Sequence, residues 1–426
     1  MSAVVVAAPY CASLKKTALA RGFVLLVVFC LTLTSAVAAF QVSALAGESY
    51  GNFTAVSEMN TARSYHTATL LRSGKVLIAG GRRAFRDELD SAELYDPVAH
   101  KFIPTGKMLS ARAGHTATLL PDGKVLIAGG FKRGDALASA EVYDPLSGTF
   151  SPTGNMLVPR LWHTATLLSN GRVLITGGES HQTGITRTAE LYDPAAKKFA
   201  ATGNMTVARV LHYAAALNGG DVLIVGGARG GGPNFFFSGF TFLANADLFD
   251  PAQGRFNSVS RTSFGEHTWS NGSAVLLTNG KVLVAGGIGA DGQVVVRDAR
   301  LFDPASGQFL PTGSMTSERY RHESTLLSDG RVLVTGGLKT VRWPPTVIAT
   351  AELYDPERGV FISLPDMTTP RTGHTATLLP SGEVLIAGGS RGSFISISAA
   401  ELFRPAPNVR HPSANIRADR PQTPKP

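Results

Sequence analysis

The feature that most constrains the fold of this chain is a recurring stretch, seen clearly at residues 112–130 as RAGHTATLLPDGKVLIAGG. Residues 116–120 and 125–128 are short, apolar and β-prone, and Asp122-Gly123 between them tolerates the positive φ values of a tight hairpin turn. The second strand has no polar residue to mark a solvated face, so we expect burial on both sides. Each copy therefore predicts a β-hairpin that ends at a Gly-Gly pair.

The stretch repeats with a period near fifty residues. The Gly-Gly pairs close at residues 81, 130, 178, 227, 287, 337 and 389, with intervals of 49, 48, 49, 60, 50 and 52. A unit of this size cannot bury both of its faces alone and must stack on copies of itself. The chain of 426 residues also exceeds a comfortable single core, and repetition is the usual solution.

Two further strands are predicted in each unit. After a variable loop comes a strand that ends in Asp-Pro, as at residues 92–97, because proline cannot donate to a sheet ladder. The seventh copy has Arg404 in place of the aspartate. Six residues after each of the six aspartates stands a phenylalanine, which marks a fourth strand. The four antiparallel strands of a unit are called A to D in chain order.

The order of the strands predicts a closed ring. Seven copies of strands A, B and C follow residue 60, but only six copies of strand D do. The seventh D strand stands at the start, where Phe53 and Met59 have the same spacing as the other phenylalanines and methionines. This offset makes sense only if the N-terminal strand completes the last unit and removes the open edges.

The double glycines after an apolar strand, the downstream Tyr-Asp-Pro and the period near fifty resemble kelch repeats, including those of the galactose-oxidase central domain. The resemblance covers residues 50–404. It implies an all-β, seven-bladed β-propeller of four-stranded antiparallel blades, with strand A nearest the axis and the ring closed by the N-terminal strand. Kelch propellers include enzymes and binding modules, so the resemblance is specific for fold rather than function.

The two ends differ from the repeats in composition. Residues 1–38 combine early basic residues, an apolar run at 22–33 and a small-residue triplet at 36–38, which is the pattern of a signal peptide. We expect a secreted or periplasmic protein, and the alternative is an uncleaved membrane anchor with the propeller outside the cytoplasm. Residues 405–426 form a proline-rich basic tail that we expect to be disordered. Cys11 and Cys30 lie in the leader, so the cleaved chain has no disulfide.

The charge of the repeats excludes one class of partner. The formal net charge of +9 falls to +2 once the three basic residues of the leader and the net +4 of residues 404–426 are set aside. This balance does not suit a polyanion, and no nucleic-acid motif is present. We therefore expect no nucleic-acid partner.

The candidate binding residues lie on the variable loops, which connect strands B to C and D to A on one face of the ring. Exposed aromatic residues beside arginine suit a sugar or a partner protein. The alternative is that the phenylalanines cover the channel end or pack on a neighbouring loop. The residues are Phe235, Phe236, Phe237, Phe240, Trp269, Arg342 and Trp343.

The sequence offers two routes to an enzyme. Galactose-oxidase-type kelch enzymes use a tyrosine bonded to a cysteine, and cleavage of the leader removes both cysteines. Other kelch proteins resemble sialate epimerases, and the loop cations here, among them Arg82, Arg133 and Arg391, could hold a carboxylate; the alternative is a solvated basic rim. We expect a monomeric module that binds a glycan or a protein, with an enzyme on acidic sugars as the alternative. An enzyme should show polar side chains converging in an axial pocket, and a binding module a flat aromatic rim.

Histidines recur at the start of strand A, but a structural role explains a residue that every ordinary blade repeats, so we expect neither a metal nor a cofactor. They are His66, His115, His163, His212, His322 and His374.

The seven copies also predict an ion pair in each regular blade. Six have an arginine three residues before the strand A histidine and an acid on strand C, and the fifth lacks both, with Arg300 at the acid position. Strands A and C lie two strand spacings apart, about 9.6 Å, within the joint reach of arginine and glutamate. We expect partly buried pairs with a structural role. They are Arg63–Glu93, Arg112–Glu141, Arg160–Glu190, Arg209–Asp247, Arg319–Glu352 and Arg371–Glu401.

Overall fold

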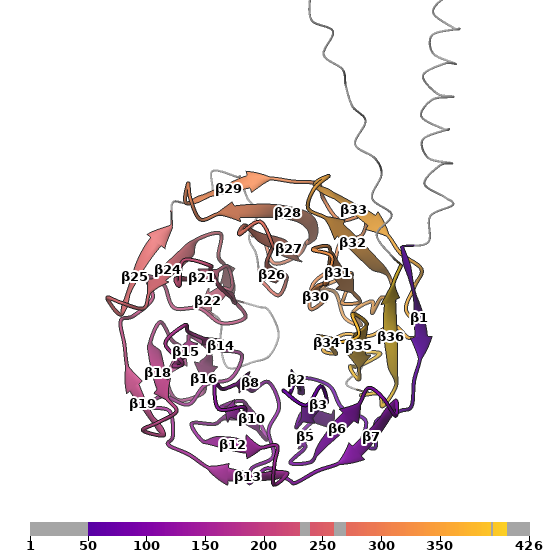
Figure 1. Cartoon of the computed structure of the whole chain (residues 1–426). Helices are drawn as coiled ribbons and strands as arrows, with labels where there is room; N and C mark the ends of the chain where they lie inside the picture. Colours follow the sequence, from indigo (N-terminus) through magenta and orange to yellow (C-terminus); the bar gives the residue numbers. More distant parts are fainter. Residues whose placement is uncertain (1–49, 231–238, 260–269, 393–394, 407–426) are drawn as a thin grey trace, which may run out of the picture. The chain divides into compact units, whose positions relative to one another are not determined.

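The computed structural model describes residues 50–230, 239–259, 270–392 and 395–406. Within these ranges every regular element is a β-strand, and the strands form seven four-stranded sheets arranged in a ring (Figure 1). No described helix is long and apolar enough to cross a membrane. The predicted fold class is therefore confirmed. The leader and the tail from residue 407 lie outside the described residues, so both stay predictions.

Each blade is a meander of four antiparallel strands with strand A innermost (Figure 1). The first three blades are β2 Thr67–Leu70, β3 Val76–Ala79, β6 Ala92–Asp96 and β7 Lys101–Pro104; β8 Thr116–Leu119, β9 Val125–Ala128, β12 Ala140–Asp144 and β13 Thr149–Pro152; and β14 Thr164–Leu167, β15 Val173–Thr176, β18 Ala189–Asp193 and β19 Lys198–Ala201.

The next four blades repeat this order. They are β20 Tyr213–Ala216, β21 Val222–Val225, β24 Ala246–Asp250 and β25 Arg255–Val259; β26 Ser273–Leu276, β27 Val282–Ile288, β28 Val295–Asp303 and β29 Gln308–Pro311; β30 Glu323–Leu326, β31 Val332–Thr335, β32 Ala351–Asp355 and β33 Val360–Ser363; and β34 Thr375–Leu378, β35 Val384–Ala387, β36 Ala400–Pro405 and β1 Gly51–Ala55.

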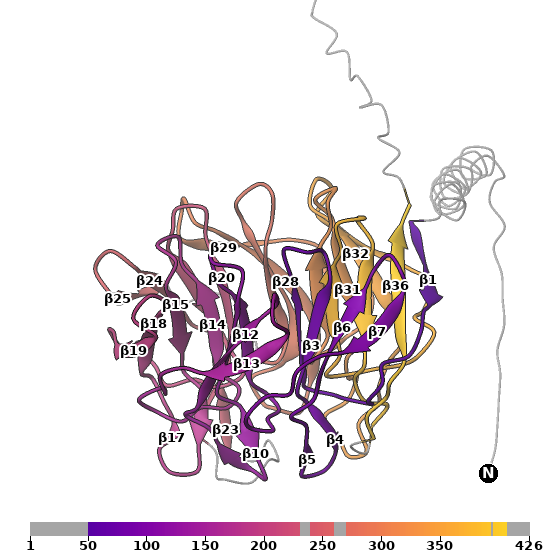
Figure 2. The same cartoon turned by 60° about the horizontal axis from the view of Figure 1, so that its bottom comes forward.

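Short hairpins extend the B–C loops of the first four blades on one face of the ring, the lower face in Figure 2. They are β4 Arg82–Ala84 with β5 Asp87–Glu88, β10 Phe131–Lys132 with β11 Asp135–Ala136, β16 Glu179–Ser180 with β17 Gly184–Ile185, and β22 Ala228–Gly230 with β23 Phe240–Phe242.

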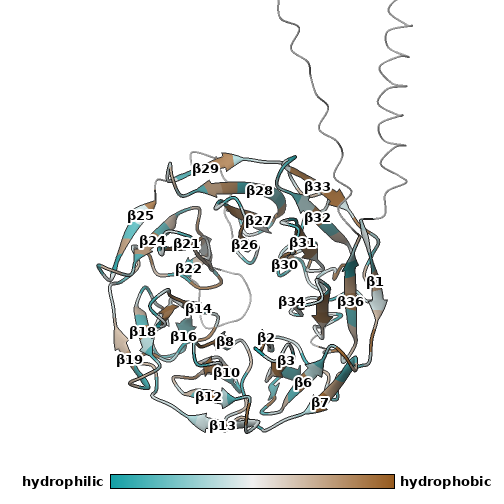
Figure 3. Cartoon of the chain, in the orientation of Figure 1, coloured by the Kyte–Doolittle hydropathy of each residue, from teal (hydrophilic) through white to brown (hydrophobic). Residues whose placement is uncertain are grey.

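Strand B is buried on both sides, as its sequence predicts. In the second blade, Val125 and Ile127 pack with Leu77 of the first blade, whereas Leu126 packs with Ile175 of the third. Every residue of β9 has an exposed fraction of 1% or less. Burying one such side chain contributes about 1.5–3 kcal/mol. The core is thus a set of seams between neighbouring blades, and the strand between the labels β34 and β36 in Figure 3, which is β35 in Figure 1, is brown and apolar.

The predicted hairpin turn is also present. The Leu120 amide donates to the Lys124 carbonyl at 2.8 Å, and the Gly123 amide donates back to Leu120 at 2.9 Å. Gly123 has a φ of 88°, which a side chain would disfavour.

The N-terminal strand closes the ring. Strand β1 pairs with β36 over the whole of its length, from Gly51 opposite Pro405 to Ala55 opposite Glu401. The Phe53 and Phe403 rings lie 5.0 Å apart, which repeats the Tyr–Phe ring contacts of the other blades. The closure prediction is confirmed. Strand β36 runs on to Pro405 because its outer neighbour comes from the other end of the chain, so no C–D turn follows it.

The fifth blade departs from the other six. Its strands β27 and β28 continue past Gly286-Gly287 with a register shift between Ala285 and Gly287, and are longer than predicted. A Cβ on Gly272, which stands where the other blades have histidine, would lie 2.5 Å from the Ala285 carbonyl and 2.6 Å from that of Gly286. The missing side chain therefore lets strand B approach closely at this position.

Candidate functional site

A buried arginine supports the base of the B–C loop in each regular blade. The Arg112 guanidinium donates to the Gly129 carbonyl at 2.7 Å, to the Ser139 carbonyl at 2.9 Å and to the Glu141 carboxylate at 2.8 Å. Arg112 is fully buried. Charge-assisted bonds of this kind are the stronger hydrogen bonds in proteins, and together they tie strands A, B and C together under the loop.

All six predicted pairs are present, and their side chains are at most 3% exposed. They are thus more deeply buried than expected, and the Gly-Gly pair of the preceding blade lies against each arginine, as the Gly81 amide does by donating to the Arg112 carbonyl at 2.9 Å. The N···O distances are 2.8 Å for Arg63–Glu93, 2.8 Å for Arg112–Glu141, 2.8 Å for Arg160–Glu190, 3.2 Å for Arg209–Asp247, 2.6 Å for Arg319–Glu352 and 2.7 Å for Arg371–Glu401.

A belt of seven residues encircles the channel mouth on the same face, one residue before strand A's histidine position in each blade. All seven have a left-handed backbone, with φ between 53° and 60°. Backbone N–H···O bonds of 2.6 to 3.4 Å link six of the seven neighbouring pairs around the axis. The belt residues are Tyr65, Gly114, Trp162, Leu211, Asn271, Arg321 and Gly373.

The belt is conformationally costly and varied in its side chains. Five of its seven members are not glycine, and a left-handed non-glycine residue costs about 1–3 kcal/mol. A constant backbone therefore presents five different side chains, from the five blades whose belt residue is not glycine. Strain that the surrounding structure enforces is a feature of binding and catalytic sites.

The histidines below the belt are structural. Their Nε2 atoms bond side-chain hydroxyls of the preceding blade at 3.0 to 3.1 Å, as His115 does with Thr67. Burial lowers the pKa of His66, His163 and His322 to about 3, so these rings are neutral. Among the described residues, no three His, Cys, Asp or Glu side chains could share a metal ion.

The first residue of strand A breaks the repeat in two blades. Five blades have Thr or Ser there, whereas the fourth has Tyr213 and the sixth has Glu323. The blade after Tyr213 has Gly272 in place of the histidine, and the buried Tyr213 hydroxyl has no hydrogen-bond partner among the described residues. Beside Glu323, His374 bonds Thr335 of strand B instead. Both exceptions thus lie in the blades that flank the irregular fifth blade.

These exceptions and six of the seven belt residues line a pocket of about 220 Å³ at the channel mouth, here called the axial pocket. Arg321 donates to the Tyr65 hydroxyl at 2.9 Å, and the Arg82 guanidinium lies 4.7 Å from the centre of the Tyr65 ring. The Trp162 ring meets Tyr65 edge-on at 5.1 Å. The side chains that matter below are Tyr65, Trp162, Tyr213, Asn271, Arg321 and Glu323.

The acidic side of the axial pocket is electrostatically unusual. Burial raises the pKa of Glu323 to about 7, although the residue as a whole is only half-buried. Burial also raises the pKa of Tyr213 well above its ordinary value; Arg321 opposes this shift and Glu323 adds to it. No described residue donates a hydrogen bond to the Glu323 carboxylate. The pocket therefore holds a carboxyl group whose pKa is raised to about 7, beside a buried phenol that no described residue hydrogen-bonds.

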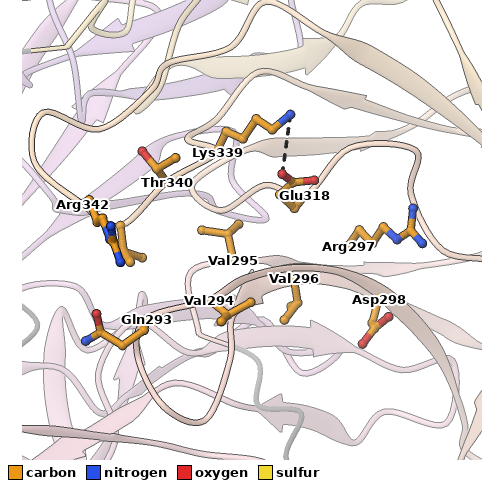
Figure 4. Close-up of a pocket in the computed structure, with 11 residues that line it drawn as sticks. Gln293, Val294, Val295, Val296, Arg297, Asp298, Glu318, Lys339, Thr340 and Arg342 are labelled. Atoms are coloured by element: carbon orange, nitrogen blue, oxygen red, sulfur yellow. Dashed lines mark ion pairs between the residues drawn. The ribbon is translucent and has the colours of Figure 1, made fainter. Parts of the chain in front are cut away.

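A second hollow of about 500 Å³ lies between the fifth and sixth blades on the same face and is here called the inter-blade groove (Figure 4). Val294, Val295 and Val296 lie between Arg342 at one end and Arg297 at the other. Lys339 and Glu318 form an ion pair of 3.5 Å above the valines in that view.

The predicted site residues separate in the structure. Arg342 lines the inter-blade groove, and Trp343 is 61% exposed. Phe240 is half-buried in β23 and packs with Phe242 on an apolar cluster, which matches the packing alternative. Phe235, Phe236, Phe237 and Trp269 lie outside the described residues.

The axial pocket was missed by the loop analysis. A comparison of the seven first residues of strand A would have singled out Tyr213 and Glu323. The belt could not be recognised from the sequence, because its left-handed backbone occurs at residue types that rarely adopt that conformation.

Comparisons with known proteins bear on the fold. The kelch motif family matches residues 111–157. A solved structure described as a fungal alcohol oxidase of the AA5 family in complex with copper is 18% identical, with a TM-score of 0.64 over 84% of this chain and 76% of that chain. No curated protein matches the chain. At this identity the likeness shows the fold alone, and among the described residues no group of three His, Cys, Asp or Glu side chains could hold a metal ion.

Proposed function

We propose that this chain, a kelch-repeat β-propeller of seven blades, is an extracytoplasmic binding module that recognises a glycan through its B–C/D–A face. The axial pocket carries the proposal. It combines aromatic faces at Tyr65 and Trp162 with hydrogen-bonding groups at Asn271, Arg321 and Glu323, and sugars need both kinds of contact. The sequence pattern of residues 1–38 supports the location outside the cytoplasm.

The volume of the axial pocket limits its ligand. At about 220 Å³ it lies below the range of about 300–1,000 Å³ that drug-sized ligands occupy. It therefore suits one sugar unit, with the rest of a glycan outside. No described residue hydrogen-bonds the Tyr213 hydroxyl or the Glu323 carboxyl, and sugar hydroxyls would supply partners for both.

A glycan array tests the proposal. We expect the wild-type protein to bind a defined set of sugars, and Arg321→Met or Trp162→Ala to lose that set while unfolding at an unchanged temperature. Arg172→Met is the matched control, because Arg172 is 50% exposed and lies at the A–B turns of the opposite face. Array signals that both axial variants retain would contradict the proposal.

Glu323 favours a second candidate function, an enzyme that acts on an acidic sugar. A group with a pKa of about 7 both takes and gives protons at neutral pH, and general acid–base catalysis requires this. The pocket has the convergent polar side chains expected of an enzyme. Incubating array hits in deuterium oxide separates the two functions: an enzyme introduces deuterium or forms product, and Glu323→Gln stops it, whereas a binding module leaves the sugar unchanged.

A further inference from the structure

The inter-blade groove has an apolar floor with a cation at each end. Val294 is 54% exposed, and it sits where the β27–β28 hairpin of the fifth blade reaches beyond its Gly-Gly pair. Figure 4 shows Arg342 beside Gln293 and Arg297 beside Asp298, on opposite sides of the valines. The volume of about 500 Å³ is within the range of ligand sites.

The charge of the inter-blade groove is not balanced by the described residues. Lys339 is paired with Glu318 at 3.5 Å. Arg297 and Arg342 have no ion pair or side-chain hydrogen bond with any described residue. A guanidinium offers a planar fork of donors that matches a carboxylate, so two of them at a distance suit a ligand that carries more than one carboxylate.

Backbone pairing around the groove argues against a peptide as the ligand. Peptides often bind by adding a strand to an exposed sheet edge, and that mode needs free backbone amides and carbonyls. Backbone groups on both sides of this groove already bond within the chain. The bonds run from the amides of Gln293 and Val294 to the Asp291 carboxylate, and from the amides of Met315 and Arg319 to the carbonyls of Arg297 and Val296.

We propose that the inter-blade groove binds an acidic glycan chain, with the carboxylates of separate uronate units on Arg297 and Arg342 and the apolar faces of the sugars on the valines between them. Trp343, exposed on the same B–C loop as Arg342, offers a further stacking surface for a sugar ring. The inference rests on the proposed function in that it names the glycan class, and it adds a site that the axial pocket does not share.

Calorimetric titration with tetragalacturonate, the galacturonate monomer and an octaglutamate peptide at low ionic strength tests the inference. We expect Arg297→Gln and Arg342→Gln each to weaken tetragalacturonate binding at least about tenfold, because each loses one charge-assisted contact. Arg83→Gln is the control on the same face, since Arg83 is 63% exposed and already paired with Asp87. Its binding should stay within about twofold of wild type, because exposed pairs contribute little.

Three results would overturn the inference: equal tetragalacturonate affinity in both groove variants, equal loss in Arg83→Gln, or octaglutamate binding as tight as tetragalacturonate. The axial pocket gives an independent readout. Arg321→Met should abolish binding of the array monosaccharides. In an Arg321→Met background, Arg297→Gln and Arg342→Gln should still weaken tetragalacturonate binding. A protein that binds tetragalacturonate through the groove but binds no monosaccharide would support this inference and contradict the axial pocket as the primary site.

Discussion

Replacing Arg112 by methionine tests the buried ion pairs most severely. The change removes the partner of Glu141, whose side chain is 3% exposed and keeps only the amides of Leu109 at 2.6 Å and Ser110 at 3.0 Å. It also leaves the Gly129 and Ser139 carbonyls without the guanidinium. Removing one partner of a buried pair typically costs about 3–5 kcal/mol, because the remaining charge stays desolvated. We expect Arg112→Met to lower the free energy of unfolding by that amount.

Urea unfolding followed by tryptophan fluorescence measures the loss, provided that the slope with urea is unchanged. Arg83→Met is the matched control: its pair with Asp87 is short, at 2.7 Å, but 63% and 38% exposed, so its loss should cost less than about 1 kcal/mol. The double variant Arg112→Met/Glu141→Leu should recover much of the stability, because no charge is left unpaired. A cost below about 1 kcal/mol for Arg112→Met would refute the view that these pairs hold the loop bases.

Three further predictions follow from the fold and the face. Deletion of residues 47–58 removes β1 and exposes the edge of β36, so we expect loss of cooperative unfolding or aggregation; unchanged melting would contradict ring closure. The free energy of unfolding should fall as pH drops below 6.5, because histidines of the unfolded chain then bind protons, whereas His66, His163 and His322 have a pKa of about 3 in the folded protein. Each histidine can lower the free energy of unfolding by at most about 1.4 kcal/mol per pH unit, and urea unfolding from pH 7 to 5 measures the loss. Trp343→Ala should weaken partner binding with unchanged melting, whereas replacing Asp122-Gly123 should do the reverse; normal binding by Trp343→Ala would remove this loop from the site.

Most of the fold can be predicted from the sequence, because residues with the same structural role recur at the same position in each of the seven repeats. A Phe-to-Met spacing near residue 53 predicted the closing strand, and the fifth copy, which lacks both charges, pointed to the Arg–acid pairs. Close approach explains the glycines: a Cβ on Gly129 would lie 2.7 Å from the Arg160 carbonyl and 2.9 Å from the Met156 methyl of the next blade. Repetition makes such structural needs visible.

The candidate site was harder to predict, because it consists of departures from the repeat whose meaning depends on neighbouring blades. The sequence left Phe240 open between binding and packing, and the structure packs it on a cluster from the fourth, fifth and sixth blades. Tyr213 and Glu323 stand in strands that look ordinary, and only the ring brings both beside Gly272. The belt depends on a left-handed backbone whose amides donate to carbonyls of the preceding blade, and no single repeat encodes these bonds.

The variant Glu323→Thr tests the central claim most directly, because it restores the residue that most blades have at this position. Burial raises the Glu323 pKa from 4.5 to about 7, so its contribution to stability is present below pH 4.5 and lost as pH rises through 7. At pH 8 we expect Glu323→Thr to unfold with a free energy about 1–3 kcal/mol higher than wild type. In the same samples, Glu323→Thr should no longer bind the monosaccharides that the wild-type protein binds on the array. A Glu323→Thr protein that binds those sugars with wild-type affinity would contradict the assignment of the axial pocket as the ligand site.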